Sequence, residues 1–256
     1  MGREILDSEL ARLMLLLQDR GAENINLVTA TQFVPGILSA ARRAREQGLT
    51  LPLLWNSSGY ERLETLEMLE GAVDVFLPDC KTLDEEVSRR LLGAADYPEV
   101  ARQALERMVA ARPLLWEGEG DEKRLLRGVI VRHLVLPGLL ESTRRVLRWF
   151  AASLDGRALL SVMFQYTPNS RVNVASAPGL SRRRLLPPEI RRVLGWLEGL
   201  GIDEGYVQEA AEADAWLPDF ARTNPFPAGQ AVPVWHWRED ALFAPGRLSP
   251  DRSPSR

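Results

Sequence analysis

The run RGVIVRHLVLPG at residues 127–138 places the tightest limit on how this chain can fold. It is apolar almost throughout, rich in β-branched residues and closed by Pro-Gly, which is typical of a strand buried on both faces of a parallel sheet. Arg132 and His133 interrupt it and, because side chains alternate along a strand, they point to opposite faces. At least one of them is therefore expected to need a partner in a closed space, as a structural residue or as part of a binding site.

Segments with strand character alternate with helical segments on both sides of this run. Further strands are expected at residues 24–29, 51–56, 73–77, 158–164 and 206–208. Helices are expected at residues 7–20, 35–48, 61–69, 83–92, 97–111, 141–153 and 187–200, with a charged loop at 117–123. Asp7 or Ser8 is the expected cap of the first helix. This alternation predicts an α/β fold with a parallel sheet, and 256 residues suffice for one barrel of that kind.

The predicted organisation is a partial (β/α) barrel over residues 1–208 followed by a C-terminal extension over residues 209–256. The extension is rich in Pro and Arg, and its last residues are expected to be disordered.

The composition excludes several classes of function. A formal net charge of −3 gives no electrostatic case for a nucleic-acid or membrane partner. The single cysteine, Cys80, excludes an intramolecular disulfide and a metal site built from the cysteines of one chain. No window is long and apolar enough to span a bilayer, and the first residues lack the pattern of a signal peptide. We therefore expect a cytoplasmic protein.

Polar side chains recur where the expected strands end. In a parallel barrel, the edge formed by the C-terminal ends of the strands carries the ligand site. This placement predicts that the protein binds a ligand there. The residues concerned are Thr29, Thr31, Asn56, Ser58, Asp79, Lys81 and Gln165.

Seven motifs around these strand ends occur in an order that resembles a known family. They are NINLVTAT at 24–31, LPLLWNSSGY at 51–60, VDVFLPDCK at 73–81, ADYP at 95–98, VRHLVLPG at 131–138, MFQY at 163–166 and GYVQ at 205–208. Together they resemble the radical SAM proteins related to pyruvate formate-lyase activating enzyme, over roughly residues 7–208. The resemblance implies a partial barrel in which a [4Fe-4S] cluster binds S-adenosylmethionine (SAM) and cleaves it to a 5′-deoxyadenosyl radical. In activating enzymes that radical takes a hydrogen atom from a glycine of a partner protein, so a glycyl-radical protein is a candidate partner.

The resemblance also implies roles for individual residues. It places Thr29 and Thr31 near the SAM amino group and Lys81 at the SAM carboxylate. Gln165 would lie against the adenosine. The further candidates beside SAM, where a monovalent cation could bind, are Asn56, Ser57 and Asp79, and Arg132 and His133 complete the set of candidate cofactor-binding residues. For Asn56 and Gln165, turn and cap roles remain open, and Asp79 and Lys81 could form a solvated turn.

One departure from the family is large. The cluster needs three cysteines spaced CxxxCxxC after the first strand, and this sequence has only Cys80. We expect a chain that is N-terminally truncated, lacks the first strand of the barrel and is inactive alone. Smaller departures are Ala30 and Gln32 where relatives have Pro and His, and Cys80 and Thr82 where relatives have an aromatic residue and Tyr.

Three functions remain open at this point. The chain is a fragment of a radical SAM enzyme, a noncatalytic binding module that has lost the radical chemistry, or an unrelated barrel enzyme that uses Asp79, Arg132 and His133 for acid–base catalysis. The third is the weakest, because no second carboxylate at the strand ends pairs with Asp79 in sequence.

Overall fold

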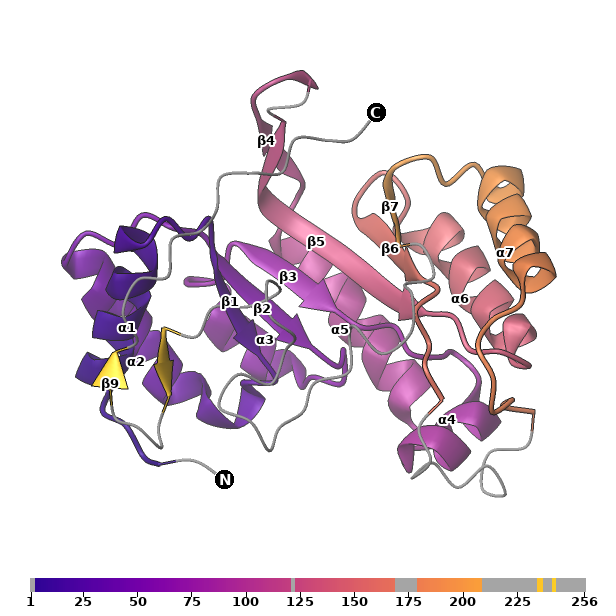
Figure 1. The fold of residues 1–256 in the computed structure, drawn as a ribbon, viewed down its shortest axis with the longest axis horizontal. Coiled ribbons are helices and arrows are strands. Elements are labelled where there is room, and N and C mark those ends of the chain that lie inside the picture. The colour runs from indigo at the N-terminus through magenta and orange to yellow at the C-terminus, as the bar shows by residue number, and fades with distance from the viewer. Residues whose placement is uncertain (1–2, 121–122, 169–178, 209–233, 237–240, 243–256) are drawn as a thin grey trace.

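A seven-stranded sheet organises the part of the chain that the structure describes, namely residues 3–120, 123–168, 179–208, 234–236 and 241–242 of a computed structural model. Six strands lie in the order β1-β2-β3-β5-β6-β7, and all neighbours in this series are parallel (Figure 1). These strands are β1 (Ile25–Val28), β2 (Leu53–Ser57), β3 (Val75–Pro78), β5 (Arg124–Leu134), β6 (Leu159–Met163) and β7 (Gly205–Gln208). Within the described residues β1 and β7 do not pair, so the predicted α/β partial barrel is confirmed as an open sheet.

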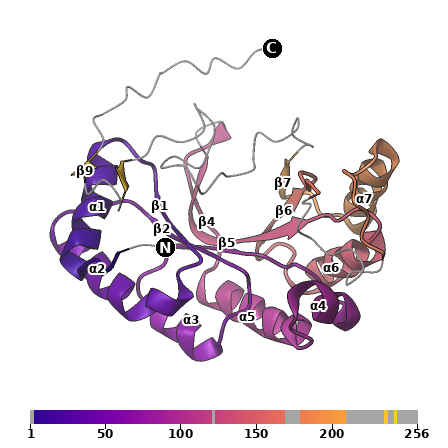
Figure 2. The ribbon, with the colours of Figure 1, turned by 60° about the horizontal axis from the view of Figure 1, so that its bottom comes forward.

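The helices lie along the outer, convex side of the bent sheet (Figure 2). They begin and end close to the predicted positions, and α5 and α7 coincide with them. Two prolines start α7, and Gly201, with φ +69°, ends it in the left-handed region that favours glycine. The helices are α1 (Asp7–Asp19), α2 (Val34–Glu46), α3 (Leu63–Leu69), α4 (Glu85–Leu92), α5 (Tyr97–Ala111), α6 (Leu140–Ser153) and α7 (Pro187–Leu200), with a 3₁₀ turn η1 (Thr31–Phe33) before α2.

The hydrophobic core fills the space between the sheet and these helices. Trp55, Phe76 and Phe150 are fully buried in it, and so are Val129 and Val131 on the outer face of β5. The inner-face positions of β5 are only half-buried. The expectation that this strand is buried on both faces is therefore wrong, because helices cover one side of an open sheet and nothing among the described residues encloses the other to the same degree.

A short antiparallel hairpin replaces part of the predicted charged loop. Strand β4 (Leu115–Glu117) pairs with the first residues of β5, and this hairpin projects beyond the sheet at the top of Figure 1. Lys123 lies 4.4 Å from the centre of the Trp116 ring, a cation–π contact at its tip. The sequence predicted a loop at 117–123 but not the strands that flank it at 115–117 and 124–126, because both strands of an exposed hairpin carry charged side chains and show no apolar alternation.

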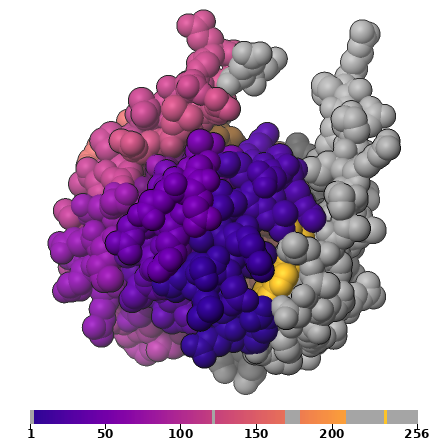
Figure 3. Space-filling model, turned by 90° about the vertical axis from the view of Figure 1, so that its left-hand side faces the viewer, coloured from indigo at the N-terminus to yellow at the C-terminus, as the bar shows by residue number. Residues whose placement is uncertain are grey.

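The first helix and the described part of the C-terminal extension lie against each other. The α1 start is closed by Glu9, whose carboxylate accepts the Leu6 amide hydrogen at 2.8 Å, rather than by Asp7 or Ser8. Strands β8 (Trp235–His236) and β9 (Ala241–Leu242) form their own two-stranded sheet beside the N-terminal segment (Figure 3). The Arg3 guanidinium lies 5.2 Å from the Trp235 ring centre. The predicted disordered end, like most of residues 209–256, lies outside the described residues.

A search of the described helices for a bilayer-spanning segment finds none with the necessary length and apolar character.

Candidate functional site at the C-terminal edge of the sheet

Three adjacent strands place polar side chains on the inner face of the sheet, at the edge where the strands end. Asn56 lies in β2, Asp79 directly follows β3, and Arg132 lies in β5. The backbone of Asp79 pairs with that of Arg132 in a parallel bridge, and this register sets the two side chains next to each other. The strand-end pattern named Asn56 and Asp79, and the fold sets them beside Arg132, which lies within its strand.

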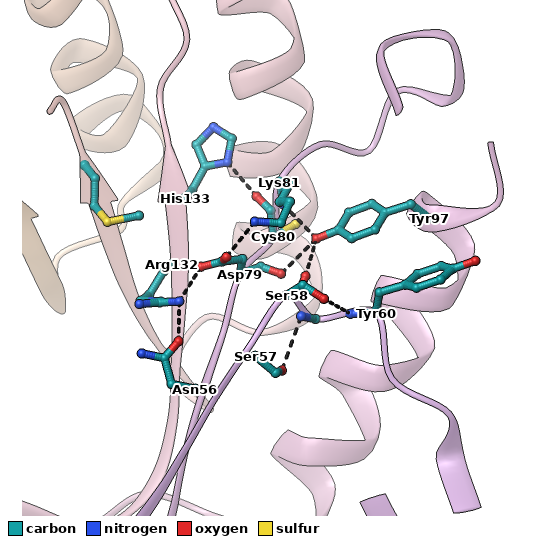
Figure 4. Close-up of polar contacts among 12 residues, drawn as sticks. Asn56, Ser57, Ser58, Tyr60, Asp79, Cys80, Lys81, Tyr97, Arg132 and His133 are labelled. Atoms are coloured by element: carbon teal, nitrogen blue, oxygen red, sulfur yellow. Dashed lines mark hydrogen bonds and ion pairs between the residues drawn. The ribbon is translucent and has the colours of Figure 1, made fainter. Parts of the chain in front are cut away.

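Lys81 joins them to form what we call the rim cluster: Asn56, Asp79, Lys81 and Arg132 (Figure 4). Arg132 Nη2 donates to Asn56 Oδ1 at 2.6 Å and lies 2.7 Å from Asp79 Oδ1. Lys81 Nζ lies 2.7 Å from Asp79 Oδ2. Two cations therefore share one carboxylate, which leaves the rim cluster with one net positive charge.

The Arg132 guanidinium has unused hydrogen-bonding capacity. Its Nε is buried and has no hydrogen-bond partner among the described residues. A buried donor without an acceptor is unfavourable by about 1–3 kcal/mol, so an additional acceptor at this position would be stabilising. Together with the excess positive charge, this favours the binding of an anionic group at the rim.

His133, the neighbour of Arg132, points into the core on the other side of the strand (Figure 4). Its side chain is 2% exposed, with Nδ1 2.7 Å from the Cys80 carbonyl oxygen and Nε2 3.0 Å from Thr143 Oγ1. Because a carbonyl only accepts, Nδ1 carries the proton and Nε2 accepts from the threonine hydroxyl. Burial lowers the pKa of His133, so the ring is neutral at pH 7. Of Arg132 and His133, the arginine is therefore the one at the candidate site.

The remaining predicted site residues lie around the rim cluster without joining it. Ser57 is 4% exposed on the outer face, where its Oγ accepts the Gly59 amide hydrogen at 3.3 Å. Thr29 is exposed in a left-handed conformation, with φ +53°, directly after β1. Thr31 Oγ1 donates to Glu61 at 2.8 Å, and Gln165 Nε2 lies 3.8 Å from Met163 Sδ. Among the described residues, no side chain of these four hydrogen-bonds to the rim cluster.

Cys80 lies beside the rim cluster but faces the core. It is completely buried, and this burial raises the pKa of its thiol to about 12, so the group is protonated at neutral pH. Iron–sulfur clusters are held by several thiolates. The residues of this chain therefore do not fit a [4Fe-4S] cluster, and the described residues contain no group of three or more His, Cys, Asp or Glu side chains placed to hold a metal ion.

Sequence reasoning missed two buried residues that contact this region. The Glu61 side chain, 3% exposed, accepts from Thr31 Oγ1 and from Trp55 Nε1 at 3.2 Å. Tyr97 reaches from the start of α5 to the residues that follow β2 and β3. The sequence signal for Tyr97 was its place in the ADYP motif at 95–98. Glu61 directly follows the LPLLWNSSGY motif, but nothing in the sequence indicates that it turns back toward Trp55.

Comparison with known proteins gives one relative in sequence. The chain is 30% identical over 196 residues to the uncharacterized protein MJ0674 of Methanocaldococcus jannaschii, and the matched region covers 76% of this chain and 52% of that protein. The chain spans about half the length of this curated relative. No family model matches the sequence.

Comparison of structures gives several similar folds. A domain of pyruvate-formate lyase-activating enzyme from Bacteroides vulgatus matches with a TM-score of 0.51 at 10% identity, over 73% of this chain and 99% of that chain. A radical SAM methyltransferase from Sphaerobacter thermophilus matches with a TM-score of 0.54 at 15% identity, over 80% and 58%. SuiB from Streptococcus suis, solved with SAM bound, matches with a TM-score of 0.54 at 10% identity, over 84% and 45%. The fold is therefore the open parallel barrel that radical SAM enzymes have.

Proposed function

We propose that these 256 residues are the SAM-binding part of a radical SAM protein similar to the glycyl-radical activating enzymes. The rim cluster carries the proposal, because it combines a net positive charge with an unpaired, buried guanidinium nitrogen at the edge of the barrel where ligands bind. The similarity to the fold of radical SAM enzymes supports the choice of ligand.

In this proposal Lys81 and Arg132 hold the SAM carboxylate. Both are already oriented by Asp79, so little side-chain freedom is lost when the anion binds. Asn56 fixes the guanidinium from the other side through its amide oxygen. The half-buried Leu77 and Ile130, which flank the polar row on the inner face, offer apolar contact to the rest of the ligand.

The radical chemistry requires a cluster that these residues do not hold. Cluster cysteines would have to come from outside the 256 residues, either from another part of a longer chain or from a second protein. In this proposal the hydrogen-atom abstraction is carried out by that complete assembly, which would also bind any glycyl-radical protein that loses the hydrogen atom.

The second candidate function is a binding module that keeps the SAM site without the radical chemistry. The buried, protonated Cys80 favours it, because the one thiol near the site is unsuited to bind iron. An in-frame CxxxCxxC sequence directly upstream of the first codon would decide for the enzyme.

Calorimetric titration with SAM tests the site in either case. We expect a dissociation constant in the high micromolar range, about −5 to −6 kcal/mol, and a weakening of about tenfold in Lys81→Ala. Lys123→Ala is the matched control, because it removes a lysine from the projecting hairpin and should leave the affinity unchanged. 5′-Methylthioadenosine, which lacks the amino acid end, should bind the wild type and Lys81→Ala equally. Equal affinity of the wild type and of Lys81→Ala for SAM would show that Lys81 is not part of the site.

Anaerobic reconstitution with iron and sulfide tests the assignment of the cluster. We expect a colourless protein that does not cleave SAM, because one buried cysteine cannot hold a [4Fe-4S] cluster. Stoichiometric iron with cluster absorbance would contradict the conclusion that the ligands lie outside these residues.

A further inference from the structure

The peptide that carries Asp79 and Lys81 has a partner for each backbone polar group from the Asp79 amide to the Lys81 amide. Two of these groups bond to neighbouring strands: the Asp79 N–H donates to the Ser57 carbonyl at 2.9 Å and the Cys80 N–H to the Arg132 carbonyl at 2.8 Å. The other three bond to buried side chains, not to backbone. Beyond the end of a strand, the sheet no longer supplies a hydrogen-bond partner for every backbone N–H and C=O group. The remaining partners must come from side chains that lie beside the peptide.

Tyr97 supplies two of the three side-chain contacts. Its hydroxyl oxygen accepts the Lys81 amide hydrogen at 3.0 Å. The same hydroxyl oxygen lies 2.8 Å from the Ser58 carbonyl oxygen and 3.0 Å from the Asp79 carbonyl oxygen, so the two carbonyls share its one proton. One buried hydroxyl thus joins the turn after β2 to the residues after β3, and the ring that carries it stacks on Tyr60 with 5.7 Å between centres (Figure 4).

His133 supplies the third contact, by donating from Nδ1 to the Cys80 carbonyl. The tautomer that permits this donation is maintained by Thr143, whose hydroxyl donates to Nε2. A hydroxyl pair between Thr82 and Ser142, 2.7 Å apart, adds a second link from the same peptide to α6.

Gly59 shows how closely the turn after β2 approaches this peptide. Its φ is +74°, and a Cβ atom there would lie 2.2 Å from the Asp79 carbonyl oxygen. Only glycine permits that approach without displacing the peptide. Four elements, β2, β5, α5 and α6, therefore converge on the four residues from Asp79 to Thr82.

We propose that Tyr97 and His133 are positioning residues: they fix the peptide that carries Asp79 and Lys81, so that Asp79 orients Lys81 and Arg132 in the geometry in which these two cations bind the SAM carboxylate. The inference rests on the proposed function for the identity of the ligand, while the fixed conformation of the peptide rests on the contacts above. Because the peptide is held from four sides, the binding site is preformed, and the ligand does not have to order it.

Tyr97→Phe tests the inference by removing one oxygen while keeping the buried ring. The Lys81 amide is then left without its acceptor, and we expect SAM to bind about tenfold more weakly. Tyr60→Phe is the matched control, because the Tyr60 hydroxyl contacts only the exposed Asp96 at 2.9 Å and the ring stack is kept. We expect the control to bind like the wild type. Thr143→Val, which removes the donor to His133, provides a second variant and should weaken binding two- to threefold.

A double-mutant cycle separates positioning from general destabilisation. If Tyr97 acts through Lys81, Tyr97→Phe should change SAM affinity by less than about twofold in a Lys81→Ala background. A loss of affinity equal in both backgrounds would overturn the proposal.

Amide hydrogen exchange gives an answer that does not depend on SAM. We expect the Lys81 amide to exchange at least about tenfold faster in Tyr97→Phe, with the amides of Val129 and Val131 unchanged. Unchanged exchange at Lys81 would overturn the positioning role. Failure of the wild type to bind SAM, with faster exchange at Lys81 in the variant, would instead refute the proposed ligand and leave the role of Tyr97 in place.

Discussion

Replacing Asp79 with Asn should lower the stability of the fold and at the same time raise its affinity for small anions. The substitution preserves the shape of the side chain but removes the one carboxylate that Lys81 and Arg132 share. Two cations then face each other at the rim without a counter-charge. The fold loses two ion pairs. An anion that reaches the rim then interacts with the two cations that had paired with the Asp79 carboxylate.

The size of the stability loss follows from the exposure of the partners. The Arg132 and Asp79 side chains are 26% and 20% exposed, so their charged hydrogen bond should contribute about 1.5–3 kcal/mol. Lys81 is 39% exposed, and a pair with that much solvent contact contributes about 0–1 kcal/mol. We therefore expect Asp79→Asn to lower the free energy of unfolding by about 1.5–4 kcal/mol.

Urea denaturation followed by tryptophan fluorescence measures this loss, since Trp55 is fully buried and reports unfolding of the sheet. Glu117→Gln is the control, because it breaks an ion pair with Arg124 on the exposed hairpin and should lower stability by no more than about 1 kcal/mol. Repeating both titrations with added sulfate tests the second effect. Sulfate stabilises most proteins by exclusion, so the informative quantity is the extra stabilisation of Asp79→Asn over Glu117→Gln.

Two results would refute this reasoning. A stability loss in Asp79→Asn no larger than in the control would mean that water already balances the rim cations. An equal response of both variants to sulfate would mean that Lys81 and Arg132 do not form an anion site, which would also weaken the proposed role of the rim cluster.

Three further predictions follow from other parts of the fold. The pKa of buried His133 is lowered, so the unfolded state binds its proton more readily and stability should fall as pH drops below about 6.5; His133→Gln should flatten this dependence in urea titrations at pH 5.5 and 7.5. The Arg183 guanidinium holds the pKa of Glu189 down to about 2, so Glu189→Gln should lower stability by about 1–3 kcal/mol at pH 7, a difference that fades as pH falls from 4.5 toward 2. The Ile25 amide bonds to Pro52, directly before β2, and the Thr29 amide to Asn56 in β2, so the amides of Asn26 and Val28 face the open edge of β1. These two amides should exchange faster than those of β5, and light scattering should detect self-association.

The sequence predicted the helices well wherever their ends carry local signals. Proline in the first turn marks the start of α5 and of α7, and both helices lie where they were expected. Strand β4 was missed because its signal is not local: Leu115 and Glu117 are both exposed, and the pairing of this strand is decided by β5.

At the site, the rule that ligands bind at strand ends selected Asn56 and Asp79, whereas Arg132 lies within β5 and was noticed as a polar interruption of an apolar run. The family resemblance selected Ser57, although alternation along β2 places it on the opposite face from Asn56. The choice between Arg132 and His133 could not be made from β5 alone. It depends on the register with β3, which only the folded sheet defines.

The rim cluster retains its net positive charge only because the sheet is open on its inner side. Full burial of Lys81 and Arg132 around one carboxylate would leave one charge without compensation, at several kcal/mol. Partial exposure keeps that charge hydrated, and the hydrogen bonds of Tyr97 and His133 to the backbone of residues 79–81 keep it in place. An anion that displaces this water interacts with both Lys81 and Arg132 in a fixed geometry, whereas a neutral ligand would only remove the hydration of these two cations. The same two cations thus explain both effects: they make the loss of the Asp79 carboxylate destabilising, and they select a carboxylate ligand over a neutral analogue.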